Sequence, residues 1–466
     1  MANRNMKKNV FQVAVFLMFL FCCLGIYIMY IQVIQADALA RNPLNQRKTM
    51  AQDDVLRGSI LDAHGKKLAF SPQKGSRSYP LGAVMAPVTG YVGQKIGNAG
   101  IEGYANGDLC GLTEDMSRLG PVAQLLRSEQ GNDVKLTIDA AVQQAAYDAL
   151  GNRRGAVVVL DARTGAVLAM VSRPAYDPNR IDADWPALNQ QADSPLLNRA
   201  AQGLYPPGST IKVMMADAAL KEQATNLSEI FDCQGVLDLG GGYTLHESHG
   251  AVHGRVNLEK AVTESCNITF GTLAMRMGAS KLDTAFERFG FRKTLDNEIT
   301  ESVSHLPDFA SLGKGDIAQV GIGQSSLLVT PLRMAMLASA FADQGVMMKP
   351  YLIDEVVTPG GLVVKKSRPE KWLEVTTPER ASLIDGFMEK VVTEGTGTAA
   401  RIQGVRVTGK TGTAENSGGA DHAWFIGSAE IHGQKIAFAI IVENSGGGGT
   451  EAAPIAKKIM MSLLDT

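Results

Sequence analysis

The longest uninterrupted run of apolar positions lies near the start of the chain. Residues 13–31 provide 19 positions without a charged side chain, close to the roughly 20 that an α-helix needs to cross the hydrocarbon core of a membrane. The apolar core of a signal peptide is shorter, about 7 to 15 residues. A retained anchor is therefore favoured over a cleaved signal, although residues 36–38 and 38–40 offer Ala-x-Ala cleavage sites. The pattern predicts a short tail over residues 1–12 and a transmembrane helix over residues 13–35.

A polar connector and a small domain are expected after this anchor. Residues 51–150 contain short strand-like runs, a turn at Asp62-Ala-His-Gly65 and an alanine-rich helical stretch over residues 139–150. We predict that residues 36–150 form a juxtamembrane connector followed by a small pedestal domain.

The remaining part, residues 151–466, mixes strand and helix patterns. Two β-rich runs flank Arg163-Thr-Gly165, which predicts a hairpin. The other expected elements are strands over residues 405–408, 423–431 and 435–443, and helices after Asn257, after Pro331 and over residues 452–464. The pattern indicates an α/β domain of the α+β type, in which a sheet carries helices on its faces.

Ser209 and Lys212 are the first candidates for chemistry. Tyr205-Pro-Pro-Gly208 cannot continue as helix, whereas residues 209–224 are rich in helix formers, so Ser209 is expected near a helix N-terminus. Free backbone N–H groups there can stabilise an oxyanion, and Lys212 at i+3 shares the same helix face. Lysine acts as a base near neutral pH only when burial or a second cation lowers its pKa from about 10.4. Lys410 is a candidate for that second cation.

Two further motifs distinguish this pair from an ordinary capping serine beside a solvated lysine. Ser265-Cys-Asn267 adds a hydroxyl and an amide, and Lys410-Thr-Gly412 follows a β-branched stretch. A strand ending in hydroxyls, with a glycine where a ligand approaches the backbone, suits a carboxylate-bearing substrate laid alongside it. The ordered triple supplies the groups needed for acyl transfer through a serine ester.

With these motifs in this order, the chain resembles the penicillin-binding proteins. The specific likeness is to the monofunctional class B D,D-transpeptidases of the short, penicillin-binding protein A-like form. It extends to residues 57–62, 99–102, 134–139, 155–161, 194–200, 321–324 and 330–332, and it covers nearly the whole chain after the first 50 residues. The resemblance implies an antiparallel five-stranded sheet flanked by helices plus a helical lobe, with residues 151–466 as the transpeptidase domain.

The resemblance also implies catalytic roles for five residues, Ser209, Lys212, Ser265, Asn267 and Lys410. Ser209 would attack the penultimate D-alanine carbonyl of a peptidoglycan stem peptide, and Lys212 would take its proton. Ser265 would relay a proton toward the leaving D-alanine. Asn267 would hold the peptide amide and help to position Lys212.

Substrate binding is implied for the third motif. Lys410, Thr411 and Thr413 would seat the terminal carboxylate of a D-Ala-D-Ala end, and Gly412 would leave space for the substrate backbone. The backbone N–H groups of Ser209 and Thr413 would form the oxyanion hole. An amine from a neighbouring strand would then complete the cross-link, and a β-lactam would acylate the same serine.

Composition adds few constraints. The 466 residues, 45% of them hydrophobic and with a formal charge of −2, suffice for two domains and a substantial core and give no reason to invoke nucleic acid. Of the five cysteines, two lie in the apolar span, and Cys110, Cys233 and Cys266 are scattered without a disulfide framework. Cys266, inside the second motif, is interpreted as a small packed residue.

Three histidines near Glu247 raise the question of a metal. His246, His249 and His253 could suggest zinc ligands, but intervening glycines interrupt helical spacing, so we interpret them as polar loop residues. His422 is not needed as a base, since Lys212 has that role. No metal and no cofactor are predicted.

Other functions stay open at this point. A serine β-lactamase would need a hydrolytic base such as the glutamate of a Glu-x-Glu-Leu-Asn segment, which the sequence lacks. A D,D-carboxypeptidase would use the same residues with water as the acceptor. A non-enzymatic β-lactam sensor or scaffold is disfavoured because all three motifs are intact.

The resemblance finally implies a partner and an orientation. No segment resembles a glycosyltransferase, and relatives pair with multi-spanning glycan polymerases of the shape, elongation, division and sporulation family. The positive charges on the two sides of the span are nearly balanced: Arg4, Lys7 and Lys8 before it, and Arg41, Arg47 and Lys48 after it. A cytoplasmic N-terminus with an extracytoplasmic catalytic domain therefore follows from the resemblance alone.

Overall fold

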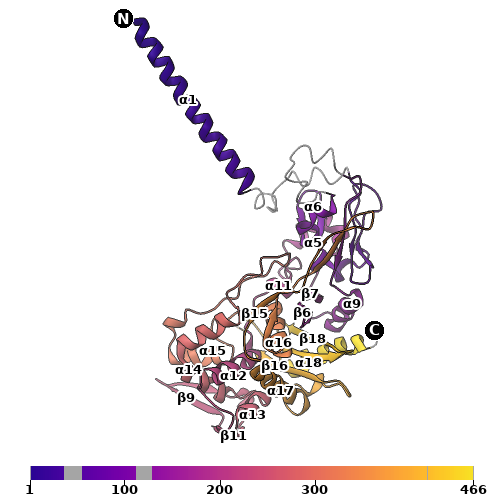
Figure 1. Cartoon of the computed structure of the whole chain (residues 1–466). Helices are drawn as coiled ribbons and strands as arrows, with labels where there is room; N and C mark the ends of the chain where they lie inside the picture. Colours follow the sequence, from indigo (N-terminus) through magenta and orange to yellow (C-terminus); the bar gives the residue numbers. More distant parts are fainter. Residues whose placement is uncertain (1, 36–54, 112–127, 417, 465–466) are drawn as a thin grey trace.

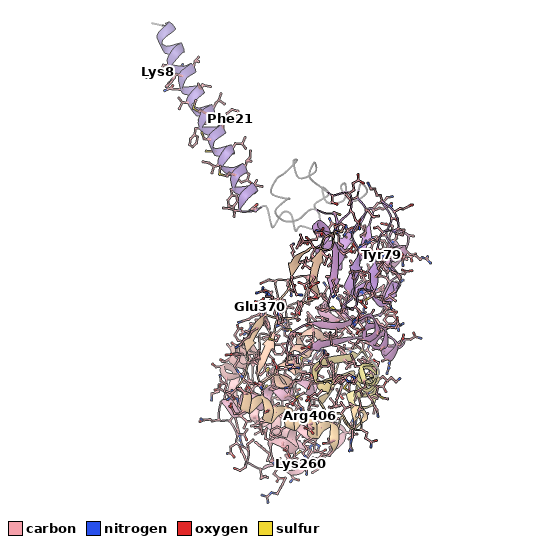
Figure 2. All side chains as sticks on the ribbon, turned by 45° about the vertical axis from the view of Figure 1, so that its right-hand side comes forward. Lys8, Phe21, Tyr79, Lys260, Glu370 and Arg406 are labelled. Atoms are coloured by element: carbon pink, nitrogen blue, oxygen red, sulfur yellow. The ribbon has the colours of Figure 1, made fainter. Side chains whose placement is uncertain are left out.

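The first helix is the candidate membrane anchor. The computed structural model describes residues 2–35, 55–111, 128–416 and 418–464. Helix α1 (Ala2–Val33) contains the stretch Lys8–Ile31, which is long and apolar enough to cross a membrane and is not buried against other described residues. Figure 2 shows its side chains, among them Phe21, standing free along the helix. The helix covers most of the predicted span and extends back into the predicted tail.

The pedestal contains a sheet built from two distant parts of the chain. The strand order is β14-β13-β5-β1-β2. In Figure 1, a brown segment from the later part of the chain lies beside the purple strands of the pedestal. Its strands are β1 (Ile60–Leu61), β2 (Lys67–Ala69), β5 (Asp133–Leu136), β13 (Ile353–Val357) and β14 (Val363–Lys366). The predicted turn joins β1 to β2, and the Gly65 N–H donates to the Asp62 carbonyl at 3.1 Å. β13 and β14 come from beyond residue 350 and complete the sheet.

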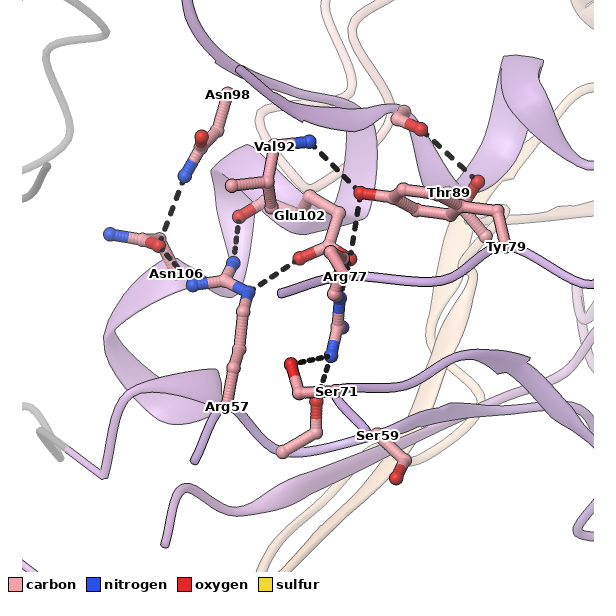
Figure 3. A network of polar contacts seen from close by, with 12 residues as sticks. Arg57, Ser59, Ser71, Arg77, Tyr79, Thr89, Val92, Asn98, Glu102 and Asn106 are labelled. Atoms are coloured by element: carbon pink, nitrogen blue, oxygen red, sulfur yellow. Dashed lines mark hydrogen bonds and ion pairs between the residues drawn. The ribbon is translucent and has the colours of Figure 1, made fainter. Parts of the chain in front are cut away.

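A buried ionic cluster lies in the pedestal (Figure 3). Glu102 is fully buried and accepts hydrogen bonds from Arg57 at 2.7 Å and from Arg77 at 2.6 Å. The Tyr79 hydroxyl donates to the same carboxylate at 3.3 Å, and Arg57 also donates to Asn106 Oδ1 at 2.6 Å. Burial raises the pKa of Glu102, but the two guanidinium groups outweigh it and lower the pKa overall. The cluster joins two of the segments that carried the family resemblance.

The central sheet confirms the predicted antiparallel five-stranded architecture. Its order is β16-β17-β18-β6-β7, and each neighbouring pair is antiparallel. The strands are β6 (Gly155–Asp161), β7 (Val167–Arg173), β16 (Val407–Ala414), β17 (His422–Ile431) and β18 (Gln434–Val442). The hairpin around Arg163-Thr-Gly165 forms as predicted, and β16 lies at an open edge.

Helices cover both faces of this sheet, which explains the continuous apolar run in β6. Val157 and Val159 pack in one cluster with α9 (Ala140–Leu150) and α18 (Gly448–Leu464). Val158 belongs to the larger core that includes α16 (Pro331–Ala342). Successive side chains of a strand point to opposite faces, so an all-apolar strand is required here.

A helical lobe packs beside the β16 edge of the sheet (Figure 1). Its helices are α12 (Lys212–Lys221), α13 (Leu258–Thr263), α14 (Asn267–Arg288) and α15 (Lys314–Gly321). It also contains two small antiparallel strand pairs. In one, β8 (Phe231–Cys233) pairs with β11 (Gly254–Val256), and in the other, β9 (Val236–Gly240) pairs with β10 (Tyr243–His246). The other elements are α4 (Ala86–Thr89), α5 (Gly100–Tyr104), α6 (Asn106–Leu109), α10 (Ile181–Leu188), α11 (Arg199–Gln202), α17 (Pro378–Thr393), β3 (Tyr91–Gly93), β4 (Gly97–Ala99), β12 (Val346–Met348) and β15 (Lys371–Glu374).

Candidate active site

Ser209 lies in a short 3-10 turn, η3 (Gly208–Ile211), that runs directly into α12. Gly208 has φ +52°, and its N–H donates to the Gly323 carbonyl at 3.0 Å. A Cβ atom at Gly208 would lie only 2.7 Å from the Thr413 carbonyl oxygen. The turn that presents Ser209 is therefore held between the segment around Gly323 and strand β16, close to the start of a helix as the sequence predicted.

Lys212 brings the first two motifs together. Its side chain is fully buried, and its Nζ donates to the Ser265 carbonyl at 2.6 Å, to Asn267 Oδ1 at 2.6 Å and to Ser265 Oγ at 3.3 Å. No hydrogen bond joins Lys212 Nζ to Ser209 Oγ among the described residues. Catalytic hydrogen bonds often tighten only once substrate is bound.

Burial lowers the pKa of Lys212 and so favours its neutral form, which can accept a proton. Desolvation lowers its pKa to about 8, while the charge of Glu247 opposes that shift. About a tenth of the amine is then neutral at pH 7. A neutral amine has two N–H groups, and the two carbonyl oxygens at 2.6 Å can accept both of them. Its lone pair is left to accept a proton from a hydroxyl group.

Ser265 and Asn267 occupy a tight turn between α13 and α14. Ser265 has φ +62°, a conformation that is uncommon for a residue other than glycine and that occurs at functional sites. Asn267 begins α14, and its Nδ2 donates to the His246 carbonyl at 3.0 Å. Its Oδ1 is thereby directed at Lys212.

Lys410 is also fully buried, in the edge strand β16, and its Nζ donates to the Thr411 carbonyl at 3.1 Å. Burial lowers its pKa well below the ordinary value, and the nearby charge of Lys212 lowers it further. The sequence proposed Lys410 as the cation that lowers the pKa of Lys212. In the structure, burial is the main cause of that shift, and repulsion between the amines adds to the effect on Lys410.

Gly412 is required by the protein's own packing. A Cβ atom there would lie 2.8 Å from Thr210 Cγ2 and 3.0 Å from Trp424 Cβ. The side chain of Thr411 is mostly buried, and its hydroxyl shares a hydrogen bond of 2.6 Å with Thr396. Thr413 is paired with β17, opposite Ala423. All three motifs therefore meet where β16 packs against η3.

Sequence reasoning missed Glu247 as a supporting residue. Its Oε1 accepts the Ile268 N–H at 2.9 Å and the Cys266 thiol at 3.0 Å, so it holds the turn that carries Ser265 and Asn267. In the sequence, Glu247 was visible only as a neighbour of three histidines.

A second supporting network fixes the segment before Ser209. The Tyr205 hydroxyl donates to Glu443 Oε1 at 2.8 Å, Arg199 donates to the same oxygen at 2.8 Å, and the Trp424 indole donates to the Pro206 carbonyl at 2.9 Å. Nothing in the sequence pattern pairs Tyr205 with Glu443, because they are 238 positions apart.

Comparison with known proteins agrees with this arrangement. The family described as "Penicillin binding protein transpeptidase domain" matches residues 155–461, and the one described as "Penicillin binding protein A dimerisation domain" matches residues 57–134. The chain belongs to the penicillin-binding protein transpeptidases. This transpeptidase is 34% identical to "Peptidoglycan D,D-transpeptidase PbpA" of Mycolicibacterium smegmatis, with 98% of this chain and 99% of that protein covered.

Solved structures are similar to the transpeptidase over most of its length. Penicillin-binding protein A of M. tuberculosis, in its imipenem acyl-enzyme complex, has a TM-score of 0.80 and 30% identity, covering 89% of this chain and all of that one. The D,D-transpeptidase domain of a peptidoglycan glycosyltransferase from Eggerthella lenta has a TM-score of 0.80 and 33% identity, covering 88% and 99%. The predicted family, fold and enzyme class, a serine transpeptidase, are confirmed.

Proposed function

We propose that this transpeptidase cross-links peptidoglycan stem peptides through an ester on Ser209, with release of D-alanine. The observation that carries the proposal is the fully buried Lys212, with its Nζ held at 2.6 Å by Asn267 and by the Ser265 carbonyl next to the turn that presents Ser209. Relatives named as D,D-transpeptidases and a neighbour captured as a β-lactam acyl-enzyme support the same chemistry.

The contacts of Lys212 support the following proposed route of acylation. Neutral Lys212 takes the Ser209 proton as the oxygen attacks the penultimate D-alanine carbonyl. The resulting oxyanion accepts hydrogen bonds from the backbone N–H groups of Ser209 and Thr413. Ser265, with its hydroxyl 3.3 Å from Lys212 Nζ, passes that proton to the departing amine of D-alanine. The amine of a neighbouring stem peptide then attacks the ester and regenerates the Ser209 hydroxyl.

The carboxylate seat couples substrate binding to the base. A terminal carboxylate held by Lys410, Thr411 and Thr413 favours the charged form of Lys410. Because the charges of the two lysines repel each other, a charged Lys410 favours the neutral form of Lys212. A donor that carries its carboxylate therefore promotes formation of the neutral base, and a β-lactam with its own carboxylate does the same.

Domain roles and location belong to the same proposal. Residues 1–12 are assigned to the cytoplasm and residues 13–35 to the membrane, which the apolar stretch in α1 supports. Residues 36–150 are assigned to the connector and the pedestal, whose sheet also takes in β13 and β14. The rest of residues 151–466 is assigned to the extracytoplasmic transpeptidase domain. A multi-spanning glycan polymerase is the proposed partner, contacted by residues 13–31 and by the pedestal.

Intact-protein mass spectrometry with a reporter penicillin tests the nucleophile. One stable adduct is expected, and Ser209→Ala should abolish it. Labelling that persists in the variant would refute the assignment, and rapid catalytic loss of penicillin would indicate a β-lactamase instead. Incubation with lipid-linked precursor and a polymerase then separates the activities, because a transpeptidase yields cross-linked dimers and a carboxypeptidase yields tetrapeptides.

A further inference from the structure

A cavity lies between the pedestal and a segment that follows β7. Its volume is about 650 Å³, which is within the range of pockets that hold small ligands. One wall consists of pedestal residues between Val55 and Gln94. The other wall consists of residues 178–183, which form η2 (Pro178–Arg180) and the first residues of α10. The residues of the active site do not line this cavity, so it is a separate candidate site.

The charged groups that line the cavity are mostly cationic. They are Arg57, Arg77, Arg180 and Asp182. The two oxygens of Asp182 accept the Gln94 N–H at 3.1 and 3.2 Å. Arg180 is 68% exposed and donates to Asp184 at 3.0 Å, but exposed ion pairs of this kind are weak. An anion that enters the cavity therefore meets three guanidinium groups and one carboxylate that is already hydrogen-bonded.

Arg77 holds a buried donor without an acceptor. Its side chain is only 6% exposed. Its Nε donates to Glu102 at 2.6 Å, and its Nη1 donates to the Gly58 carbonyl at 2.8 Å and to Ser71 Oγ at 3.4 Å (Figure 3). Its Nη2 is buried and has no hydrogen-bond partner among the described residues. Buried polar groups are nearly always paired, so this nitrogen points to an acceptor that a ligand supplies.

The two walls of the cavity are already fixed to each other. The Tyr79 N–H donates to Asn179 Oδ1 at 2.9 Å, and Asn179 Nδ2 donates to the Tyr79 carbonyl at 3.0 Å. Both residues line the cavity. A ligand would therefore bind between walls that are held in place, which lowers the cost of ordering the site.

We propose that this cavity binds a phosphodiester monoanion, with Arg77 Nη2 and the guanidinium group of Arg180 as donors to its oxygens. Guanidinium groups suit phosphate oxygens because they offer several N–H groups in one plane. The source that the chain favours is the headgroup of an anionic membrane lipid. Helix α1 contains the candidate membrane span, and the described pedestal begins at Val55, which lines the cavity.

Binding to two probes distinguishes the sources. The full-length protein in an uncharged detergent and a phosphate-free buffer is titrated with glycerophosphoglycerol, a soluble phosphodiester, and with short-chain phosphatidylglycerol. Calorimetry should show one site per chain, weakened by added salt. Binding of the lipid, alone or with the soluble ester, supports a membrane source, and binding of the soluble ester alone supports a free phosphate ester. Binding of neither probe would overturn the proposal.

Variants locate the site. Arg77→Lys and Arg180→Gln should each weaken binding about tenfold or more, because each removes a hydrogen bond to a charged group. Arg180→Gln leaves the contacts of Glu102 intact, so it tests the site even if Arg77→Lys unfolds the pedestal. The matched control is Arg368→Gln, an exposed position beyond β14, which should bind as the native protein does. Native affinity in both Arg77→Lys and Arg180→Gln would overturn the proposal.

A blocking variant provides an independent test. Ser76 lines the cavity, and Ser76→Glu would place a carboxylate among the arginines and exclude a second anion. A ligand that binds only the folded chain raises its unfolding temperature. Phosphatidylglycerol should therefore raise the unfolding temperature of the native protein and of Arg368→Gln, but not that of Ser76→Glu. An equal rise in all three would place lipid binding outside this cavity and overturn the proposal.

Discussion

Nζ of Lys212 lies 2.6 Å from Oδ1 of Asn267, a residue 55 positions further along the chain. The first belongs to α12 and the second begins α14. The packing of these two helices therefore determines where the proton acceptor sits relative to Ser209.

Replacing Lys212 by alanine should lower the rate of acylation by penicillin about 10²- to 10⁴-fold, because general-base catalysis typically contributes that much. Stopped-flow labelling with a fluorescent penicillin measures the rate. The matched control is Lys221→Ala, an exposed position at the end of the same helix. A Lys212 variant that acylates at a rate close to the native one would require a different base.

The acylation rate should rise with pH through about 8, the lowered pKa of Lys212. The base works when neutral, so the active fraction is small below this pKa and approaches its maximum above it. A second-order rate that stays constant between about pH 6 and pH 9 would argue against Lys212 as the base.

Lys410→Ala should discriminate between donors. Acyl donors with a free carboxylate should lose most of their reactivity, whereas carboxylate-free donors should lose much less, because only the former use the charge of the side chain. Competition labelling with a matched pair of donors measures the ratio. An equal loss of reactivity toward both donors would contradict the proposed carboxylate seat.

Glu102→Gln should destabilise the pedestal by roughly 3 to 5 kcal/mol, because it leaves Arg57 and Arg77 buried without a compensating charge. Thermal unfolding of the detergent-solubilised chain measures the change. The matched control is Glu129→Gln, an exposed carboxylate whose loss should have little effect. Unchanged unfolding in the Glu102 variant would show that the cluster contributes nothing to stability.

The same cluster predicts a dependence on acid. The folded-state pKa of Glu102 is lowered, so its contribution to stability is present above the unfolded pKa of about 4.3 and is lost as pH falls through the folded-state value. The native protein should therefore lose more stability than Glu102→Gln on going from neutral pH to about pH 3.

Exchanging residues 13–31 for an unrelated membrane anchor should preserve penicillin binding, because the residues of the acylation site lie beyond residue 200. Co-purification with a glycan polymerase should weaken. If the exchanged protein co-purified fully and still supported cross-linking, the span would act only as a tether, and specific contacts would lie in the pedestal.

The sequence predicted the parts of the fold that depend on local pattern. The hairpin of β6 and β7 could be read from two apolar runs and a Thr-Gly turn, and the ordered motifs indicated the site. The pairing of Val356 with Val134 could not be read, because periodicity identifies a strand but not its partner. The approach of the Cys233 and Cys266 thiols to Glu247, at 3.3 Å and 3.0 Å, could not be predicted for the same reason, since it depends on how β8 and α14 pack.

The contacts that support the active site could not be predicted from the sequence either. Glu443 reads as the polar end of a strand, yet it fixes Tyr205 at the entrance to the nucleophile turn. Gly412 was expected to make room for substrate, whereas Thr210 and Trp424 already exclude any side chain there.

The hairpin of β13 and β14 gives the pedestal a late step in folding. A ribosome releases the chain from its N-terminus, so β5 emerges long before its neighbour, in which Ile353 lies opposite Leu136. Until then the edge of β5 has unpaired backbone groups that could pair with another chain. The pedestal sheet is complete only after most of the transpeptidase domain has been synthesised. A chain truncated before residue 353 would therefore lack both the catalytic strand β16 and a complete pedestal sheet.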